Sequence, residues 1–276
     1  MDLRIRPGSG FLRRVIERML PAPLVLLCMA VAVGFGYWGL GPATLPHASA
    51  VSVAAPTVAS SFSVSAAHPS VVVIDAGHQA HGNKALEPIG PGSGKKKPAV
   101  ASGTSGVATH VHESVINLKV ALRLRSVLRA AGVTVVMVRT SEHVNITNSK
   151  RAMIANAAHA DLFVRIHCDG SKSRSTRGFL TLVPARNRWT GPIVSASARA
   201  GRDIQKASVA ITGARDRGIT PRSDMSGFNW SRVPSVIVEM GLMTNPAEDR
   251  LLSSAAYQQK LASGMASGIL SFLHGK

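Results

Sequence analysis

The chain has 276 residues, 45% of them hydrophobic, which is enough to bury the core of one domain of ordinary size. Its net charge of +18 favours an anionic partner, but aromatic residues make up only 4% of the chain, which disfavours a base-stacking surface for nucleic acid. Cys28 lies in an N-terminal apolar run, so the folded part keeps only Cys168, and an internal disulfide is excluded.

Residues 1–50 have the composition of a targeting segment. An uncharged apolar run extends from Leu20 to Gly41, and the sequence HASA ends at Ala50 with a pattern typical of a signal-peptidase site. The run is also about long enough to cross a bilayer, which takes roughly 20 apolar residues, so a retained membrane anchor is the alternative. In both cases we expect export to the cell wall, the extracellular space or the outer membrane face, because basic residues precede the run. These residues are Arg4, Arg6, Arg13, Arg14 and Arg18.

Residues 51–69 are rich in Ala, Ser and Val without charge, which predicts a linker, and residues 70–276 then form a single domain. Within this domain, apolar runs and helical spacing alternate along the chain, and a basic segment, 80–111, is expected to be a long loop. In chain order we expect a strand at 71–75, a helix at 113–132, a strand at 133–138, a helix at 147–159, strands at 161–167 and 178–183, a helix at 191–211, a strand at 235–241, and closing helices at 247–253 and 255–274.

This alternation predicts an α/β fold with a mostly parallel, mixed sheet that has helices on both faces. Sites in such sheets gather at the carboxyl ends of the strands. Three predicted strands end on polar residues: the first at Asp75 and His78, the third at His167, and the late one at Glu239. Glu113 begins the first helix. Two imidazoles and a carboxylate with an open fourth position are typical of a catalytic zinc site, and a further carboxylate can act as general base.

Spacing alone leaves other ligands open, namely His81, Glu87, His110 and His112. Cys168 adjoins His167, but a strand alternates its faces, so we expect its thiol to point away as a small buried hydrophobe rather than as a nucleophile. From the residues alone, the sequence indicates a zinc hydrolase.

The chain resembles the zinc-dependent N-acetylmuramoyl-L-alanine amidases of bacterial cell walls, of the type called amidase 3, over about residues 70–274. Five stretches carry the resemblance in order: VVVIDAGHQ, ESVINLKVALRLRSVLRAAGVTVVMVRTS, RAMIANAAHADLFVRIHCDGS, VPSVIVEMGLMTNPAEDRLL and YQQKLASGMASGIL. The resemblance implies hydrolysis of the amide between N-acetylmuramic acid and L-alanine of the peptidoglycan stem peptide. It also implies one Zn²⁺ per chain, held by His78, Glu113 and His167, with Glu239 as the catalytic carboxylate.

The sequence departs from the family's usual pattern at four positions: Ala76 stands for Pro, Gln79 for Gly, Arg165 for Ser and Leu242 for Phe. Three further residues are candidate contributors to the site. Asp75 is expected either to orient an imidazole or to end its strand as a turn acid, Arg222 to bind stem-peptide carboxylates, and Asn229, with Trp230, to line the cleft.

We expect a monomer whose basic surface binds anionic wall polymers and whose N-terminus associates with the membrane if the anchor is retained. Three other functions are weighed. One is a different zinc peptidase of the wall, and another is an amidase-like wall-binding or regulatory protein without catalysis, although all four expected site positions are occupied. The third, a nucleic-acid binder, is disfavoured because no recognised binding motif is present.

Overall fold

The computed structural model describes residues 69–275, so the predicted targeting segment 1–50 and all but the last residue of the predicted linker lie outside the described residues. The described chain forms a six-stranded sheet in the order β4-β1-β5-β8-β6-β7. The strands are β1 (Val71–Ala76), β4 (Thr134–Met137), β5 (Leu162–Asp169), β6 (Phe179–Pro184), β7 (Asp216–Arg222) and β8 (Ser235–Leu242).

The sheet is mostly parallel, as expected from the alternation of strands and helices. β1 pairs in parallel with β4 and β5, β5 with β8, and β6 with β7, whereas β6 and β8 run antiparallel. In the pairing of β5 with β8, His167 lies opposite Glu239. The ends of two strands that are far apart in sequence therefore bring these two residues to one point.

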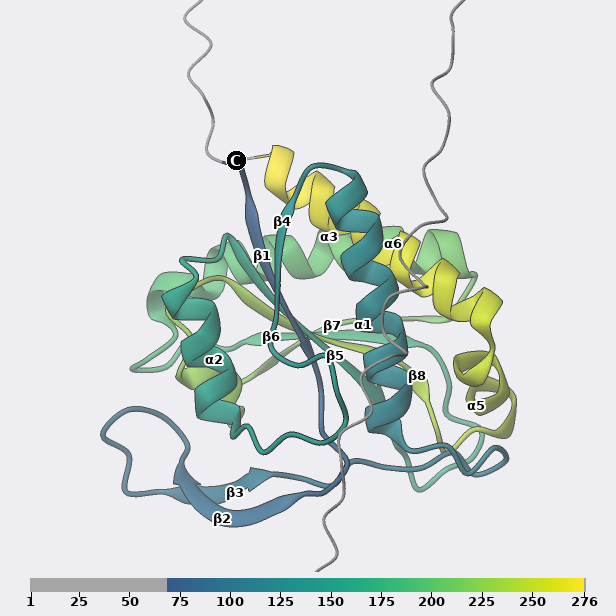
Figure 1. Cartoon of the computed structure of the whole chain (residues 1–276), viewed down its shortest axis with the longest axis horizontal. Coiled ribbons are helices and arrows are strands. Elements are labelled where there is room, and N and C mark those ends of the chain that lie inside the picture. Colours follow the sequence, from purple (N-terminus) through teal and green to yellow (C-terminus); the bar gives the residue numbers. More distant parts are fainter. Residues whose placement is uncertain (1–68, 276) are drawn as a thin grey trace, which may run out of the picture. The chain divides into compact units, whose positions relative to one another are not determined.

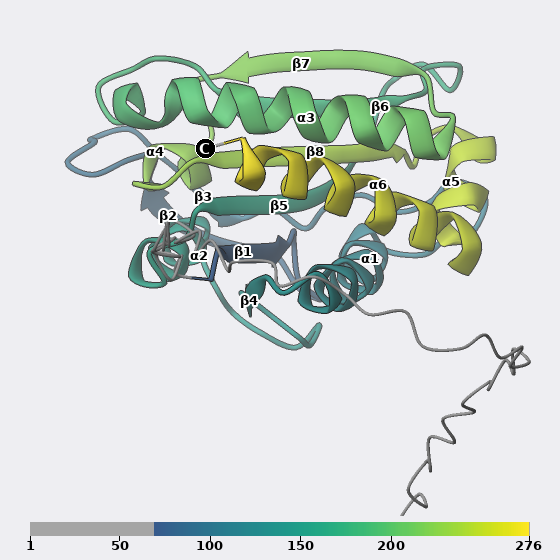
Figure 2. The ribbon, with the colours of Figure 1, turned by 90° about the horizontal axis from the view of Figure 1, so that it is seen from above.

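Helices cover both faces of the sheet, which confirms the predicted fold class. On one face α1 (Glu113–Ala130), α3 (Val194–Thr212) and α6 (Ala255–His274) lie side by side (Figure 2). On the other face lie α2 (Asn148–Ala157) and the short α4 (Ser226–Asn229), while α5 (Pro246–Ser253) follows β8 and η1 (Gly191–Ile193) precedes α3. We call these the three-helix face and the site face.

Helix α1 illustrates why the three-helix face is apolar. Ile116, Val120, Leu124 and Leu128 recur every four residues and are all fully buried in the main core, where α1 packs against β1, β4 and β5. Full burial of one such side chain contributes about 1.5–3 kcal/mol, so this helical stripe is a large part of what fixes α1 and the residue at its start, Glu113.

The expectation of a structureless loop at 80–111 is wrong. An antiparallel hairpin, β2 (Asn83–Pro88) with β3 (Lys96–Val100), occupies most of it and lies across the lower end of the sheet in Figure 1. Its polar, lysine-rich strands lack the alternation of apolar residues that identifies a strand. β7 and α4 were also not predicted. β7 is an edge strand, and its Gly218 and Pro221 are residues that argue against a strand when the sequence is read alone. Between residues 69 and 275, no helix has the length and apolar character that crossing a membrane requires.

Candidate metal centre

The turn after β1 places the first imidazole. His78 has a left-handed backbone with φ 59°, which is uncommon for a residue other than glycine. Gly77 is required by space, since a Cβ there would lie 2.2 Å from Cε1 of His167. Arg139 holds the turn from behind, because its guanidinium donates to the carbonyl oxygens of Ala76 at 2.7 Å and Gly77 at 3.0 Å.

Three side chains from three elements meet at the carboxyl end of the sheet. Oε1 of Glu113, the first residue of α1, lies 3.1 Å from Nε2 of His78 and 3.2 Å from Nδ1 of His167. One potential ligand atom from each residue lies within 4.8 Å of the others, and among residues 69–275 this is the one such group of three. His81, Glu87, His110 and His112, which spacing alone left open as ligands, do not belong to it.

The carboxylate of Glu113 is held by backbone and side-chain donors. Its Oε1 accepts from the backbone N–H of Cys168 at 3.1 Å and from Asn117 at 3.2 Å, while Oε2 accepts from the backbone N–H of Thr104 at 3.0 Å. Burial raises the pKa of Glu113, but hydrogen bonds from the two imidazoles outweigh it, and the pKa falls well below its usual range. Glu113 is therefore ionised whenever the two histidines face it.

The two imidazoles both face the carboxylate of Glu113. Nδ1 of His78 lies 2.8 Å from the carbonyl oxygen of Ala101, which can only accept, so Nδ1 carries a hydrogen. Burial lowers the pKa of His78, but the hydrogen bond between its Nε2 and Glu113 outweighs this effect and raises it. Burial lowers the pKa of His167 to about 4, and its buried Nε2 has no hydrogen-bond partner within the described chain. Two imidazoles and a carboxylate are the donor set of catalytic zinc sites, so these residues fit such an ion.

Glu239 lies beside this group at the end of β8. Together with His78 and His167 it lines a cavity of about 290 Å³, and its Oε2 is shielded from solvent without a hydrogen bond to any described residue. Burial first, and then the negative charges of Glu113 and Asp169, raise the pKa of Glu239 well above its usual value. A carboxyl with a raised pKa is what general acid–base chemistry near neutral pH requires.

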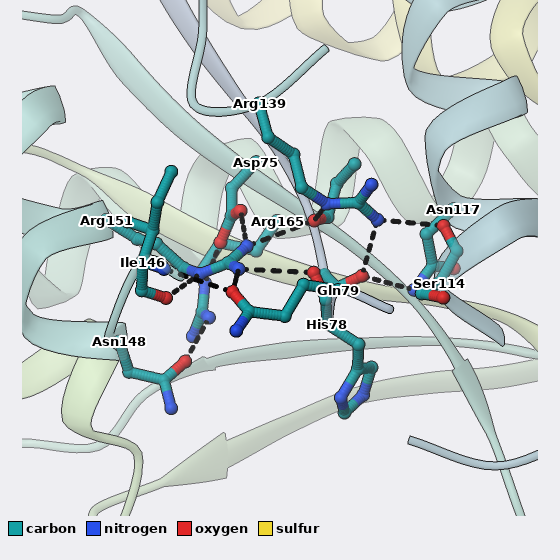
Figure 3. A network of polar contacts seen from close by, with 12 residues as sticks. Asp75, His78, Gln79, Ser114, Asn117, Arg139, Ile146, Asn148, Arg151 and Arg165 are labelled. Atoms are coloured by element: carbon teal, nitrogen blue, oxygen red, sulfur yellow. Dashed lines mark hydrogen bonds and ion pairs between the residues drawn. The ribbon is translucent and has the colours of Figure 1, made fainter. Parts of the chain in front are cut away.

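Within residues 69–275 no hydrogen bond joins Asp75 to an imidazole, so its contacts do not support the first of its two expected roles. Its two oxygens pair with Arg151 and, at 2.9 Å, with Arg165 (Figure 3). Arg151 also donates to the carbonyl oxygen of His78 at 3.1 Å and to Oε1 of Gln79 at 3.0 Å. Asp75 therefore anchors a buried arginine network that fixes the His78 turn.

Arg222 and Asn229 do not line this cavity, and their expected roles in binding substrate stay predictions. Arg222 is exposed and pairs with Asp224 at 2.7 Å. Asn229 is buried and donates to the carbonyl oxygen of Ile89, and Trp230 donates to that of Pro88, so both hold the hairpin against α4. The thiol of Cys168 lies in the core on the three-helix face, as the strand alternation predicted.

Sequence reasoning missed Arg139, Arg151 and Lys97. Arg139 and Arg151 clamp the His78 turn, and Lys97 of β3 lines the cavity. The sequence did contain a signal for Arg139, because this residue directly follows a predicted apolar strand. A charge buried at such a position needs a fixed partner, which indicates a structural role. Lys97 carried no signal, since nothing in a lysine-rich segment indicates which lysine faces a cavity.

Comparisons with known proteins agree with this site. The sequence model of the family Amidase_3, N-acetylmuramoyl-L-alanine amidase, matches residues 72–271. The N-acetylmuramoyl-L-alanine amidase Rv3717 of Mycobacterium tuberculosis is 34% identical over 81% of this chain and 95% of its own length. AmiA of Escherichia coli is 27% identical over 70% of this chain and 78% of its own.

Solved structures extend the likeness to the fold. The amidase Ami1 of Mycobacterium smegmatis superposes with a TM-score of 0.67 at 30% identity, over 75% of this chain and 98% of that one. An N-acetylmuramoyl-L-alanine amidase from Clostridium difficile 630 gives 0.62 at 27% identity, over 75% and 98%. The fold, the family match across the domain and the His-Glu-His group all agree. The chain therefore belongs to the Amidase_3 family of N-acetylmuramoyl-L-alanine amidases.

Proposed function

We propose that the amidase activity of this chain uses one zinc ion held by His78, Glu113 and His167, with Glu239 as the catalytic carboxylate. The observation that carries the proposal is that the three ligand atoms lie within 4.8 Å of one another, beside Glu239. Oε2 of Glu239 is shielded from solvent and has no hydrogen bond to any described residue. The substrate is peptidoglycan, and the bond is the amide between N-acetylmuramic acid and L-alanine.

His78, Glu113 and His167 would hold the zinc ion, and its Lewis acidity would polarise the scissile carbonyl and make water easier to deprotonate. The protein supplies the proton transfers. Glu239 takes a proton from the attacking water and returns it to the nitrogen of L-alanine as the amide bond breaks. Its position across from His167 in the pairing of β5 and β8 fixes this carboxyl beside the metal ligands.

The second contribution of the protein is rigidity. Arg139 and Arg151 hold the backbone of the His78 turn, and the N–H groups of Thr104 and Cys168 hold Glu113. Ligands fixed in this way keep their orientation without a further loss of entropy when the cation binds. The site therefore favours one arrangement of donors.

The test is mass spectrometry of purified peptidoglycan digested by the full chain. The expected products are stem peptides with a free L-alanine amino terminus beside intact glycan strands. A chelator should stop their release, and stoichiometric Zn²⁺ should restore it. Trimming at the other end of the stem would instead assign a different zinc peptidase of the wall, and digestion unaffected by the chelator would remove the metal from the proposal.

We also propose that the chain acts outside the cytoplasm and that its excess of positive charge, +18, holds it against anionic wall polymers. The support is the family's action on cell walls together with this charge. Sedimentation of the chain with purified walls, before and after extraction of their anionic polymers, tests it. Equal binding to both preparations would leave no role for the charge.

A further inference from the structure

Arg165 is a charged residue in the wall of the cavity. It lies on β5 two residues before His167, so both side chains are on the site face. Only 4% of Arg165 is exposed, yet it lines the same cavity as His78, His167 and Glu239. A guanidinium in that place is costly to bury and requires partners.

Three neighbours hold the guanidinium in one position. Nε donates to Asp75 at 2.9 Å, and Nη2 donates to Oδ1 of Asn148, the first residue of α2, at 2.7 Å. Gly227 provides the necessary space, because a Cβ there would lie 2.2 Å from Nη1 of Arg165. The side chain is therefore oriented before any ligand arrives, and this lowers the entropic cost of binding.

The same cavity contains donors that the described chain leaves unused. Nη1 of Arg165 makes no hydrogen bond within residues 69–275, and the buried hydroxyl of Ser226 has no partner there either. Lys97 lines the cavity from β3, where its ammonium donates only to the carbonyl oxygen of Asp224. Burial lowers the pKa of Lys97, the negative charge of Asp224 partly offsets this, and the positive charge of Arg165 lowers the pKa further, so an anion between Lys97 and Arg165 would relieve their repulsion.

We propose that Arg165, Lys97 and Ser226 form a subsite for a carboxylate of the stem peptide, on the peptide side of the scissile amide. This inference rests on the proposed function and names the substrate class within it. The acidic group nearest the amide is the free carboxylate of the residue after L-alanine. The subsite therefore makes the enzyme prefer a stem whose second residue carries a free acid over one in which that acid is amidated.

The structure favours a carboxylate over a neutral group. A planar guanidinium that offers a fixed N–H, joined by an ammonium and a hydroxyl, matches the two oxygens of a carboxylate, and bonds of this kind are stronger than neutral ones. The negative charge of Asp75 does not cancel the subsite, because Arg151 pairs with the other oxygen of Asp75. One net positive charge therefore remains on the cavity side of this network, in addition to Lys97.

The test compares kcat/KM of the zinc-loaded full chain on two substrates, N-acetylmuramoyl-L-alanyl-D-isoglutamate and its isoglutamine analogue. The expected preference for the acid is about 10- to 100-fold, the factor for one hydrogen bond to a charged group. Where turnover of these short substrates is too slow to measure, the Kd values of both for Glu239→Gln, from calorimetry, give the same ratio.

Variants assign the preference to the subsite. Lys97→Met and Ser226→Ala should each reduce the acid-to-amide ratio severalfold, and Arg165→Ser, which removes the guanidinium, should bring it close to one. Because Arg165→Ser also removes a partner of Asp75, the ratio within one preparation is the readout, since unfolding lowers both rates equally. Lys96→Met is the matched control: it removes the same charge from the neighbouring exposed residue of β3 and should leave the ratio unchanged.

The outcomes separate this inference from the proposed function. A wild-type ratio near one, with both substrates cleaved, overturns the subsite and leaves the amidase intact. A ratio that is high in the wild type but unchanged in Arg165→Ser assigns the preference to other residues and also overturns it. Failure to cleave both short substrates and peptidoglycan itself would overturn the proposed function instead.

Discussion

Strand β5 presents two different surfaces from one run of residues. Val164, Ile166 and Cys168 enter the apolar core under α1, α3 and α6, whereas Arg165 and His167 point to the site face. The three-helix face is stabilised by burial and packing, which tolerate exchange of one apolar side chain for another of similar volume. The site face depends on partners, because the buried charges of Asp75, Arg151 and Arg165 are paired with one another across three elements. Alternate residues of one strand therefore have different roles in this sheet. Those on the three-helix face stabilise the fold, and those on the site face form the functional site.

The largest expected effect comes from substituting, one at a time, two neighbouring residues of β5 that point to opposite faces. His167→Ala should lose zinc, measured by elemental analysis, and should lower kcat/KM by more than about 100-fold, since even residues that only support a ligand cost 10–100-fold. Cys168→Ala, one position along, should keep both zinc and activity and lose about 1 kcal/mol of unfolding free energy. Loss of zinc in both variants would show that the faces are not independent.

The second-largest effect on activity is expected for Glu239→Gln. It removes the proton acceptor while keeping the size of the side chain, so kcat should fall about 10²- to 10⁴-fold with the zinc content unchanged. The control is Met240→Leu on the three-helix face, a volume-conserving exchange that should leave kcat within a factor of two or so. Retained turnover in Glu239→Gln would remove Glu239 from the catalytic role.

Asp75→Asn probes stability on the site face. It leaves Arg151 and Arg165 buried beside a neutral amide, so the unfolding free energy should fall by about 3–5 kcal/mol in urea titrations at pH 7. Burial raises the pKa of Asp75, but the two arginines lower it well below its usual range. A lowered pKa stabilises the fold above the usual carboxyl value of about 4, and this contribution disappears as the pH falls through the folded pKa.

The pH dependence makes the Asp75 prediction specific. The difference in unfolding free energy between wild type and Asp75→Asn should be constant from pH 7 to about pH 5 and should shrink as the solution is acidified further. A difference that stays the same at pH 3 would mean that the loss comes from packing rather than from the charge of Asp75.

The smallest effect is expected on the three-helix face. Ile166→Val removes one buried methylene from the core and should cost about 0.5–1.5 kcal/mol of unfolding free energy, with kcat/KM of the folded enzyme unchanged. A fall in kcat/KM without a change in stability would indicate that packing behind β5 positions His167, which would blur the division between the faces.

Much of the fold could be predicted because periodicity reports burial directly. The apolar runs of β1, β5 and β8 and the helical spacing of α1 were visible as patterns, so the elements that carry His78, Glu113, His167 and Glu239 could be located. The hairpin and β7 were missed because their stability comes from neighbours. Trp230 and Asn229 hold the hairpin by hydrogen bonds to the backbone at Pro88 and Ile89, which no local pattern encodes.

The sequence by itself determined the type of sheet and the order of its main elements. It also indicated three residues at strand or helix ends that could share a cation and a fourth, Glu239, that could act as general base. These depend on short-range patterns and on the rule that parallel strands end at the same edge. The tertiary structure alone decided which partners those residues have. It placed Asp75 against two arginines, put Arg165 in the cavity wall and paired Arg222 with Asp224. The reason is that a buried charge takes its partner from whichever element the fold brings near, and distance along the chain does not report that contact.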